Sequence, residues 1–161
     1  MTKEEFKNIF NLNFDTVRNY IYYRCGDAEL ATDVAQDAFL KLWEKQMKYE
    51  KGNIKGLLFK ISSDIFISLY RKQKTAMNFH LRSKPQIQHQ TPEEIMQFEE
   101  LQESYNLALR SMPEKQRVVF LMHRLDGLKY YEIAESLDLS VKAIEKRMTL
   151  AISFLRKNIN N

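Results

Sequence analysis

The sequence contains few of the residues that cross-link small secreted proteins or interrupt helices. Among its 161 residues there are one cysteine, four glycines and three prolines. The single cysteine, Cys25, excludes an internal disulfide framework and fits a reducing cytoplasm, so we expect a cytoplasmic protein in which Cys25 is a small buried side chain. Scarce glycine and proline, beside abundant Leu, Lys, Glu, Ile and Gln, favour an all-α chain.

Long apolar runs are also missing. No stretch of about 18 apolar residues is present, so the sequence predicts no transmembrane helix. The first residues, Met1 to Glu5, lack the apolar segment of a signal peptide. We therefore expect neither a membrane span nor a secretory leader.

Catalytic and metal-binding patterns are absent from the sequence as well. The three histidines, His80, His89 and His123, do not pair with a serine or cysteine at the spacing of a known motif. There is no glycine-rich phosphate loop, no H-E-x-x-H and no C-x-x-C. We expect a protein that is not an enzyme by itself and that holds no metal or cofactor.

Positive charge is modest in total but concentrated in two segments. The formal net charge is +4, and the segment from Lys48 to Lys74 carries seven basic residues against Glu50 and Asp64. The segment from Lys142 to Lys157 carries five against Glu145 alone. Two basic faces suit a protein that touches DNA at two places, because neutralising phosphates supplies much of the sequence-independent affinity. Two solvated helix faces are the alternative.

Hydrophobic periodicity predicts an all-α fold of two small helical domains joined by a flexible linker. The first domain, 1–74, contains a three-helix bundle, the linker covers 75–91, and the second domain, 92–161, contains four helices. A capping box of Thr91 and Glu94 marks the start of the second domain. The predicted helices cover 3–24, 28–48, 54–73, 92–111 and 113–125, and a helix-turn-helix follows.

The segment from Lys129 to Arg156 is typical of a helix-turn-helix. Ile133, Ala134 and Leu137 form the apolar stripe of a short helix, and Ser140 offers an N-cap to a second helix. Because so few residues separate the two stripes, the helices must cross at a steep angle. The predicted inward positions of the second helix are Ile144, Met148, Ala151, Ile152 and Leu155.

The turn of this motif has Asp138 where glycine is usual, because the position favours a positive φ. Asp tolerates the left-handed conformation at a cost of about 1 kcal/mol, which the turn can sustain. The outer face of the second helix carries Lys142, Lys146 and Arg147. Such a face can enter the major groove of DNA.

The second predicted helix carries an acidic and amide stripe, Asp33, Gln36 and Asp37. DNA repels carboxylates, so this stripe favours a protein-docking surface, and an ordinary solvated face is the alternative. The loop and helix that follow combine aromatic, amide and hydroxyl groups with positive charge, a mixture that suits single-stranded nucleic acid. These residues are Tyr49, Lys51, Asn53, Lys55, Lys60, Ser63, Arg71 and Lys72.

Four segments, in the same order, resemble the sigma factors of RNA polymerase. Asp33–Glu44 is similar to the D-L-V-Q-E-V-F-L-K-L-W segment of that family, and Gly56–Ile61 with Tyr70–Lys72 resembles its promoter-melting helix. Met112–Phe120 is similar to the L-P-E-K-Q-R-E-V-F start of the family's fourth region, and Tyr131–Arg156 resembles its closing helix-turn-helix. The length and the single linker resemble the short extracytoplasmic-function (ECF) group, which keeps only regions two and four.

The resemblance implies core RNA polymerase, promoter DNA and an anti-sigma factor as partners. It implies that Asp33, Gln36 and Asp37 dock on the clamp helices of the largest polymerase subunit. The residues implied for capture and opening of the −10 element are Lys51, Asn53, Lys60, Ser63, Arg71 and Lys72. The residues implied for the −35 element, on the recognition helix, are Lys142, Ala143, Glu145, Lys146, Arg147 and Thr149.

The sequence departs from the family pattern at several of these places. In the family, the third helix usually has an Asn and, four residues later, an Asp; this sequence has Asp64 and Ser68 at those positions. A carboxylate at position 64 makes a direct DNA contact by that residue unfavourable. Leu150 stands where a basic residue is common. Glu145 either accepts a hydrogen bond from cytosine N4 and so sets sequence preference, or is a charge at the rim.

Two other functions fit parts of the sequence. A dimeric helix-turn-helix regulator of duplex DNA would explain the second domain, but it leaves the first bundle without a task and offers no spare apolar helix for dimerisation. A helical adaptor that binds only proteins would make both basic faces incidental. Three observations distinguish these functions. Co-purification with core polymerase favours the sigma factor, and binding to palindromic duplex without polymerase favours the dimeric regulator. The absence of salt-sensitive DNA binding favours the adaptor.

Overall fold

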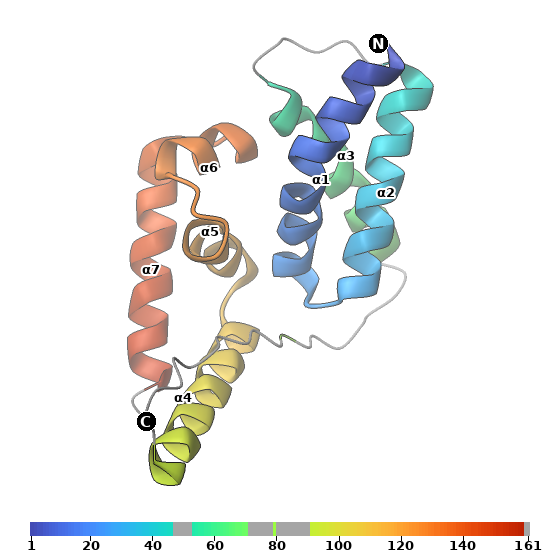
Figure 1. The fold of residues 1–161 in the computed structure, drawn as a ribbon. Coiled ribbons are helices and arrows are strands. Elements are labelled where there is room, and N and C mark those ends of the chain that lie inside the picture. Colours follow the sequence, from blue (N-terminus) through green and yellow to red (C-terminus); the bar gives the residue numbers. More distant parts are fainter. Residues whose placement is uncertain (47–52, 71–78, 80–90, 160–161) are drawn as a thin grey trace.

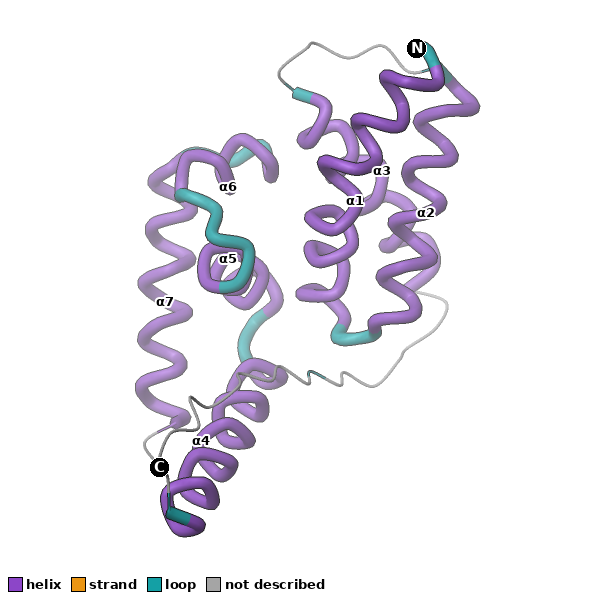
Figure 2. The backbone as a smooth tube through the Cα atoms, viewed as in Figure 1, coloured by secondary structure: helices purple, strands orange, loops and turns teal. Residues whose placement is uncertain are grey.

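The computed structural model describes residues 1–46, 53–70, 79 and 91–159. These residues form seven helices and no strand, which confirms the all-α fold class, and short turns connect several of the helices (Figure 2). None of the described helices combines the length and the apolar character needed to cross a membrane. In chain order the helices are α1 (Lys3–Cys25), α2 (Ala28–Lys45), α3 (Ile54–Tyr70), α4 (Pro92–Ser111), α5 (Glu114–Arg124), α6 (Tyr130–Leu137) and α7 (Val141–Ile159) (Figure 1).

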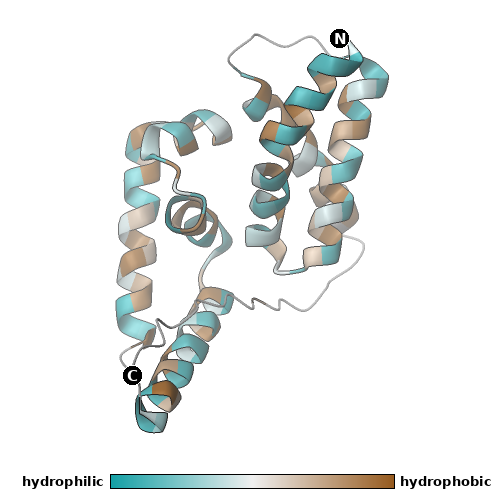
Figure 3. Ribbon diagram, in the orientation of Figure 1, coloured by the Kyte–Doolittle hydropathy of each residue, from teal (hydrophilic) through white to brown (hydrophobic). Residues whose placement is uncertain are grey.

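Helices α1, α2 and α3 form the N-terminal bundle, in which each helix contacts the other two. Gly26 ends α1 with a φ of 69°, a conformation that costs glycine little. Asp27 then caps α2, because its carboxylate accepts a hydrogen bond from the Leu30 N–H at 3.1 Å. Buried apolar side chains from α1, α2 and α3 form a shared core, and the hydrophobic stretches of these ribbons are brown in Figure 3. The three-helix bundle that the periodicity predicts is therefore present.

Cys25 lies at the end of α1 and is fully buried, as the sequence predicts. Burial raises the pKa of its thiol to about 11. The side chain is consequently protonated at neutral pH and acts as a small apolar group, because the thiolate is the reactive form of cysteine.

Helices α4 to α7 form the C-terminal half, in which α7 contacts α4, α5 and α6. Thr91 and Glu94 form the predicted capping box at the start of α4. One predicted inward position on α7 is wrong: Ile152 is 37% exposed, because it lies on the flank of the helix rather than on its inner face. The other predicted inward positions, Ile144, Met148, Ala151 and Leu155, are buried.

The turn between α6 and α7 has the conformation that the sequence predicts. Asp138 ends α6 with a φ of 55°, in the left-handed region. The N–H of Leu139 donates to the carbonyl of Ala134 at 2.9 Å, which satisfies one of the free carbonyls at the end of α6. The Ser140 hydroxyl accepts a hydrogen bond from the Ala143 N–H at 3.1 Å and caps α7.

The two halves of the chain pack directly against each other, an arrangement that the sequence pattern does not predict. Helix α1 lies against α5, and α3 lies against α6 (Figure 1). Buried apolar side chains from both halves form one connected cluster. Phe79, within the predicted linker, is fully buried, and its ring lies 5.5 Å from that of Tyr22. Residues 75–78 and 80–90 of that linker lie outside the described part of the chain.

Candidate nucleic-acid interface

Helix α7 presents a polar face opposite its buried stripe. Lys142, Glu145, Lys146 and Thr149 are exposed and lie three or four residues apart, so they share one side of the helix. The buried residues of α7 occupy the opposite side and hold the helix against α4, α5 and α6. This division leaves the polar face turned away from the protein.

Three cations in the first half of α7 are available to a ligand. Within the described residues, Lys142, Lys146 and Arg147 make no hydrogen bond and no ion pair through their side chains. The neighbouring carboxylate of Glu145 is likewise unpaired there. Free ammonium and guanidinium groups on an outward helix face suit contact with phosphates and base edges.

The remaining predicted recognition residues lie beside or within this polar face. Ala143 and Arg147 are half-buried and lie on its flank, four residues apart. Thr149 is exposed, and its hydroxyl donates a hydrogen bond to the Glu145 carbonyl at 2.9 Å. The six predicted residues therefore form one continuous outward surface, with Arg147 at its edge.

The predicted −10 residues are only partly within the described chain. Lys51, Arg71 and Lys72 lie outside it. Asn53 precedes α3 and is exposed, as is Lys60, whereas Ser63 is half-buried. The Ser63 hydroxyl accepts a hydrogen bond from the Arg24 guanidinium at 2.8 Å, so this serine is already bound within the N-terminal bundle.

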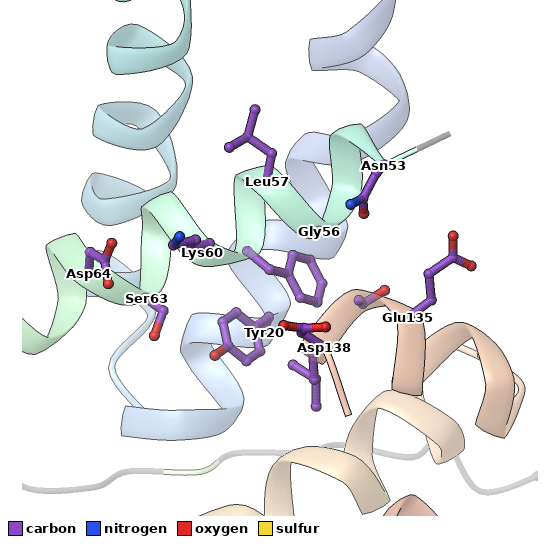
Figure 4. Close-up of a pocket in the computed structure, with 12 residues that line it drawn as sticks. Tyr20, Asn53, Gly56, Leu57, Lys60, Ser63, Asp64, Glu135 and Asp138 are labelled. Carbon is purple, nitrogen blue, oxygen red and sulfur yellow. The ribbon is translucent and has the colours of Figure 1, made fainter. Parts of the chain in front are cut away.

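Asn53, Lys60 and Ser63 face the C-terminal half across a cleft of about 540 Å³. On the opposite wall are the last residues of α6 and the turn of the helix-turn-helix, including Glu135 and Asp138 (Figure 4). The cleft thus brings two motifs, far apart in sequence, to one place: the start of α3 and the end of α6.

The acidic stripe lies on the outer side of α2. Asp33, Gln36 and Asp37 are all exposed, and their spacing puts them on one face. Their side chains make no hydrogen bond or ion pair with the rest of the described residues. Ala31, Val34, Ala38 and Leu42 are buried on the opposite side and fix the orientation of the stripe.

Sequence reasoning missed one member of the α2 surface. Leu40 follows Gln36 by four residues and Asp37 by three, and it is 52% exposed. An exposed leucine beside unpaired carboxylates gives this surface an apolar contact point, as protein interfaces have. The signal was available, because Leu40 falls outside the buried stripe of the helix.

The positions that depart from the family pattern are all at the surface. Asp64, Ser68 and Glu145 are exposed, and Leu150 is 44% exposed. Asp64 lines the cleft beside Lys60, so a carboxylate lies within the predicted −10 surface. All four side chains lie outside the buried core.

Two family models match the chain, one over the segment with the α2 surface and one over the segment with the α7 surface. The model of sigma-70 region 2 matches residues 9–76, which contain the stripe on α2 and all of α3. The model of sigma-70 region 4 matches residues 102–155, which contain the helix-turn-helix.

Curated relatives agree with these matches. The ferric citrate uptake sigma factor FecI of Escherichia coli is 24% identical over 91% of this chain and 86% of its own length. The RNA polymerase sigma factor YlaC of Bacillus subtilis is 24% identical over 98% of this chain and 93% of its own length. The ECF RNA polymerase sigma factor SigE of Mycolicibacterium smegmatis is 23% identical over 83% of this chain, which spans about half (53%) of that relative.

A solved structure shares the fold. The sigma factor RpoE of Bartonella quintana, solved in complex with the anti-sigma factor NepR, is 21% identical to this chain. The structural alignment covers 98% of each of the two chains, with a TM-score of 0.63. The matches to regions 2 and 4 and the relatives lead to one conclusion. The chain belongs to the sigma-70 family of RNA polymerase sigma factors, in the ECF group.

Proposed function

We propose that this protein is a transcription initiation factor that binds core RNA polymerase and directs it to promoters. The observation that carries the proposal is the pair of unpaired surfaces: an acidic face on α2 within region 2, and a cationic face on α7 within region 4. The first repels DNA and suits a protein partner, whereas the second suits phosphates. A dimeric regulator of duplex DNA would use only the second.

The three contacts follow from this division. Asp33, Gln36 and Asp37 dock on the clamp helices of the largest polymerase subunit, and Leu40 adds apolar contact. The outward surface of α7 lies on the −35 element. Lys60 and Asn53 receive the opened −10 element, together with Lys51, Ser63, Arg71 and Lys72. An anti-sigma factor is a further proposed partner, supported by the complex in which the similar RpoE was solved.

Transcription in vitro tests the function. Core RNA polymerase is mixed with the protein and a promoter library, and the transcripts are sequenced. We expect transcripts that start from a small set of promoters only when the protein is present. Transcripts from no promoter, combined with binding to palindromic duplex in the absence of polymerase, would instead favour the dimeric regulator.

A further inference from the structure

Arg24 lies in the last turn of α1, and most of its side chain is covered by the N-terminal bundle. The side chain is only 15% exposed. Its guanidinium carbon lies 4.6 Å from the centroid of the Phe66 ring and 5.6 Å from that of the Tyr20 ring. A guanidinium near an aromatic face is attracted by the quadrupole of the ring. Arg24 is therefore a cation held in a defined place between α1 and α3.

Two hydroxyl groups share one nitrogen of this guanidinium. Nη1 of Arg24 donates to the Ser63 hydroxyl at 2.8 Å and to the Tyr20 hydroxyl at 3.2 Å. Because a guanidinium has N–H donors and no acceptor, both hydroxyl oxygens must accept these bonds. Each hydroxyl keeps its own hydrogen for another partner. Neither of them donates a hydrogen bond to any residue that the structure describes.

Both hydroxyl groups belong to the cleft whose α3 wall the proposed function assigns to the −10 element. Tyr20 and Ser63 line this cleft, as does Lys60 (Figure 4). The Tyr20 ring has a fixed orientation, because it stacks on the Phe59 ring with centroids 4.6 Å apart and an interplanar angle of 5°. The cleft volume of about 540 Å³ lies within the range of ligand-binding clefts, about 300–1,000 Å³. The cleft is therefore large enough for a nucleobase.

The charges around the cleft favour a base over a phosphate. Asp64, Glu135 and Asp138 line it, and Lys60 is the one cation among the described lining residues. Carboxylates repel a phosphate, whereas they tolerate an uncharged carbonyl of a base. Contacts to phosphates position a strand, and contacts to bases specify sequence. The ligand that suits two hydroxyl donors here is therefore a base carbonyl, the O4 of thymine or the O6 of guanine.

We propose that Arg24 is a positioning residue for promoter recognition, which makes Ser63 and Tyr20 donors that select thymine or guanine at one position of the −10 strand. The proposal rests on the proposed function, because that function brings the −10 strand to α3. Cytosine and adenine carry an amino group where thymine and guanine carry the carbonyl. Without Arg24, each hydroxyl is free to accept a bond from that amino group as well as to donate one.

Selection from a randomised −10 strand tests the assignment. The full-length protein, bound to core RNA polymerase, captures single-stranded oligonucleotides with a randomised −10 segment, and the captured pool is sequenced. For the wild type we expect thymine and guanine to exceed cytosine and adenine at one position by at least about threefold, the size of one net hydrogen bond. Ser63→Ala and Arg24→Met should both reduce this preference at the same position. A loss of general stability would instead weaken capture at all positions alike.

The ion pair of Arg24 provides a matched control. Nε of Arg24 donates to the Glu114 carboxylate at 2.6 Å. Glu114→Gln removes the charge of this partner and leaves the bond to Ser63, so it should retain the base preference. A preference that Arg24→Met leaves intact, or that Glu114→Gln removes to the same extent, overturns the proposal. Equal weakening for all four bases in Arg24→Met, as a phosphate contact would give, overturns it as well.

A measurement on the protein alone tests the contact without DNA or polymerase. Nuclear magnetic resonance of isotope-labelled arginine reports how fast the guanidinium hydrogens of Arg24 exchange with water. We expect severalfold faster exchange at Nη1 in Ser63→Ala, and no change in Ser68→Ala, an exposed serine of the same helix. Exchange that Ser63→Ala leaves unaltered overturns the proposal, even where Arg24→Met does not fold.

The outcomes separate failure of this inference from failure of the proposed function. A wild-type complex that captures no −10 strand contradicts the proposed function. A wild-type complex that captures the strand, but with no preference for thymine and guanine at any position, overturns only the role of Arg24.

Discussion

The Tyr23 hydroxyl donates a hydrogen bond to the Asp126 carboxylate at 2.7 Å, and these residues lie in different halves of the chain. The pKa of the Tyr23 hydroxyl is raised, first by burial and then by the neighbouring Asp126, so it remains a donor. The second carboxylate oxygen of Asp126 is buried and has no hydrogen-bond partner among the described residues. This pair therefore combines a strong bond with an incompletely solvated charge.

Replacing Asp126 with Asn should raise the free energy of unfolding at neutral pH. Burial raises the pKa of the Asp126 carboxyl, against the lowering effects of its bonds to Tyr23 and Asn19 and of the Lys55 charge. The folded state therefore binds the proton more tightly than the unfolded chain, whose pKa is about 3.9, and the wild type gains stability as the pH falls through the raised folded pKa. The Asn variant lacks this gain.

Urea unfolding of both proteins at neutral pH and at about pH 4, close to the unfolded-state pKa of about 3.9, checks this prediction. The advantage of the Asn variant should shrink at the lower pH. An equal difference at both pH values would contradict the claim that burial of the carboxylate controls the effect.

The change Asp37→Arg should abolish polymerase binding while the helical fold is retained. Asp37 is exposed and its side chain has no partner among the described residues, so the change removes nothing from the core. A charge lost from a protein interface costs about 2 kcal/mol or more, which corresponds to at least ~30-fold in affinity. A pull-down with core polymerase and a circular dichroism spectrum check both parts. Glu103→Arg, the same charge reversal on exposed α4, should bind normally.

Lys146→Ala and Arg147→Ala should weaken promoter binding in different ways. Lys146 lies in the middle of the outward face of α7, whereas Arg147 is half-buried at its edge. We therefore expect Lys146→Ala to relax the −35 sequence preference, and Arg147→Ala to weaken all sequences alike and reduce the salt dependence by about one phosphate contact. Binding profiles over a −35 library at two salt concentrations check this. Identical profiles for the two variants would refute the division of roles.

Phe79→Ala should destabilise the protein although Phe79 lies outside every helix. Its ring is fully buried, and the Arg117 guanidinium carbon lies 5.0 Å from the ring centroid. Truncation of a buried phenylalanine costs about 3–5 kcal/mol. Thermal unfolding checks the size of the loss, and Phe79→Leu should lose clearly less. A melting temperature unchanged by Phe79→Ala would show that the ring contributes no packing energy.

Local signals in the sequence were sufficient for most of the helices. Thr91 and Ser140 predict helix starts because a capping hydroxyl acts within three residues, and Asp138 predicts a left-handed turn because few residues tolerate one. The predicted end of α2 was less accurate. The helix stops at Lys45 rather than at 48, because Gln46 adopts a φ of 44°. No glycine or proline near position 46 indicates that the helix ends there.

Contacts between the two halves could not be predicted in the same way. In the sequence, Arg117 is one cation in a polar helix segment, yet in the structure it is buried. Its partners, the Tyr23 and Arg24 carbonyls, lie more than 90 positions away, so the local sequence gives no sign of them. Phe79 reads as an isolated apolar residue in a polar linker for the same reason. Surface residues were easier, since the side of α2 or α7 that faces outward follows from the apolar stripe alone.

The hydrogen bond from Thr149 to the Glu145 carbonyl has a consequence for base selection. A hydroxyl has one hydrogen, and the helix uses it, so Thr149 offers a base edge only lone pairs. The Glu145 carboxylate also only accepts, whereas Lys142 and Lys146 only donate. In the proposed −35 contact the first pair matches the amino groups of cytosine and adenine, and the second pair matches guanine N7 and O6. If α7 makes the proposed −35 contact, its polar face presents acceptors beside donors, and promoters whose base edges match that arrangement should bind best.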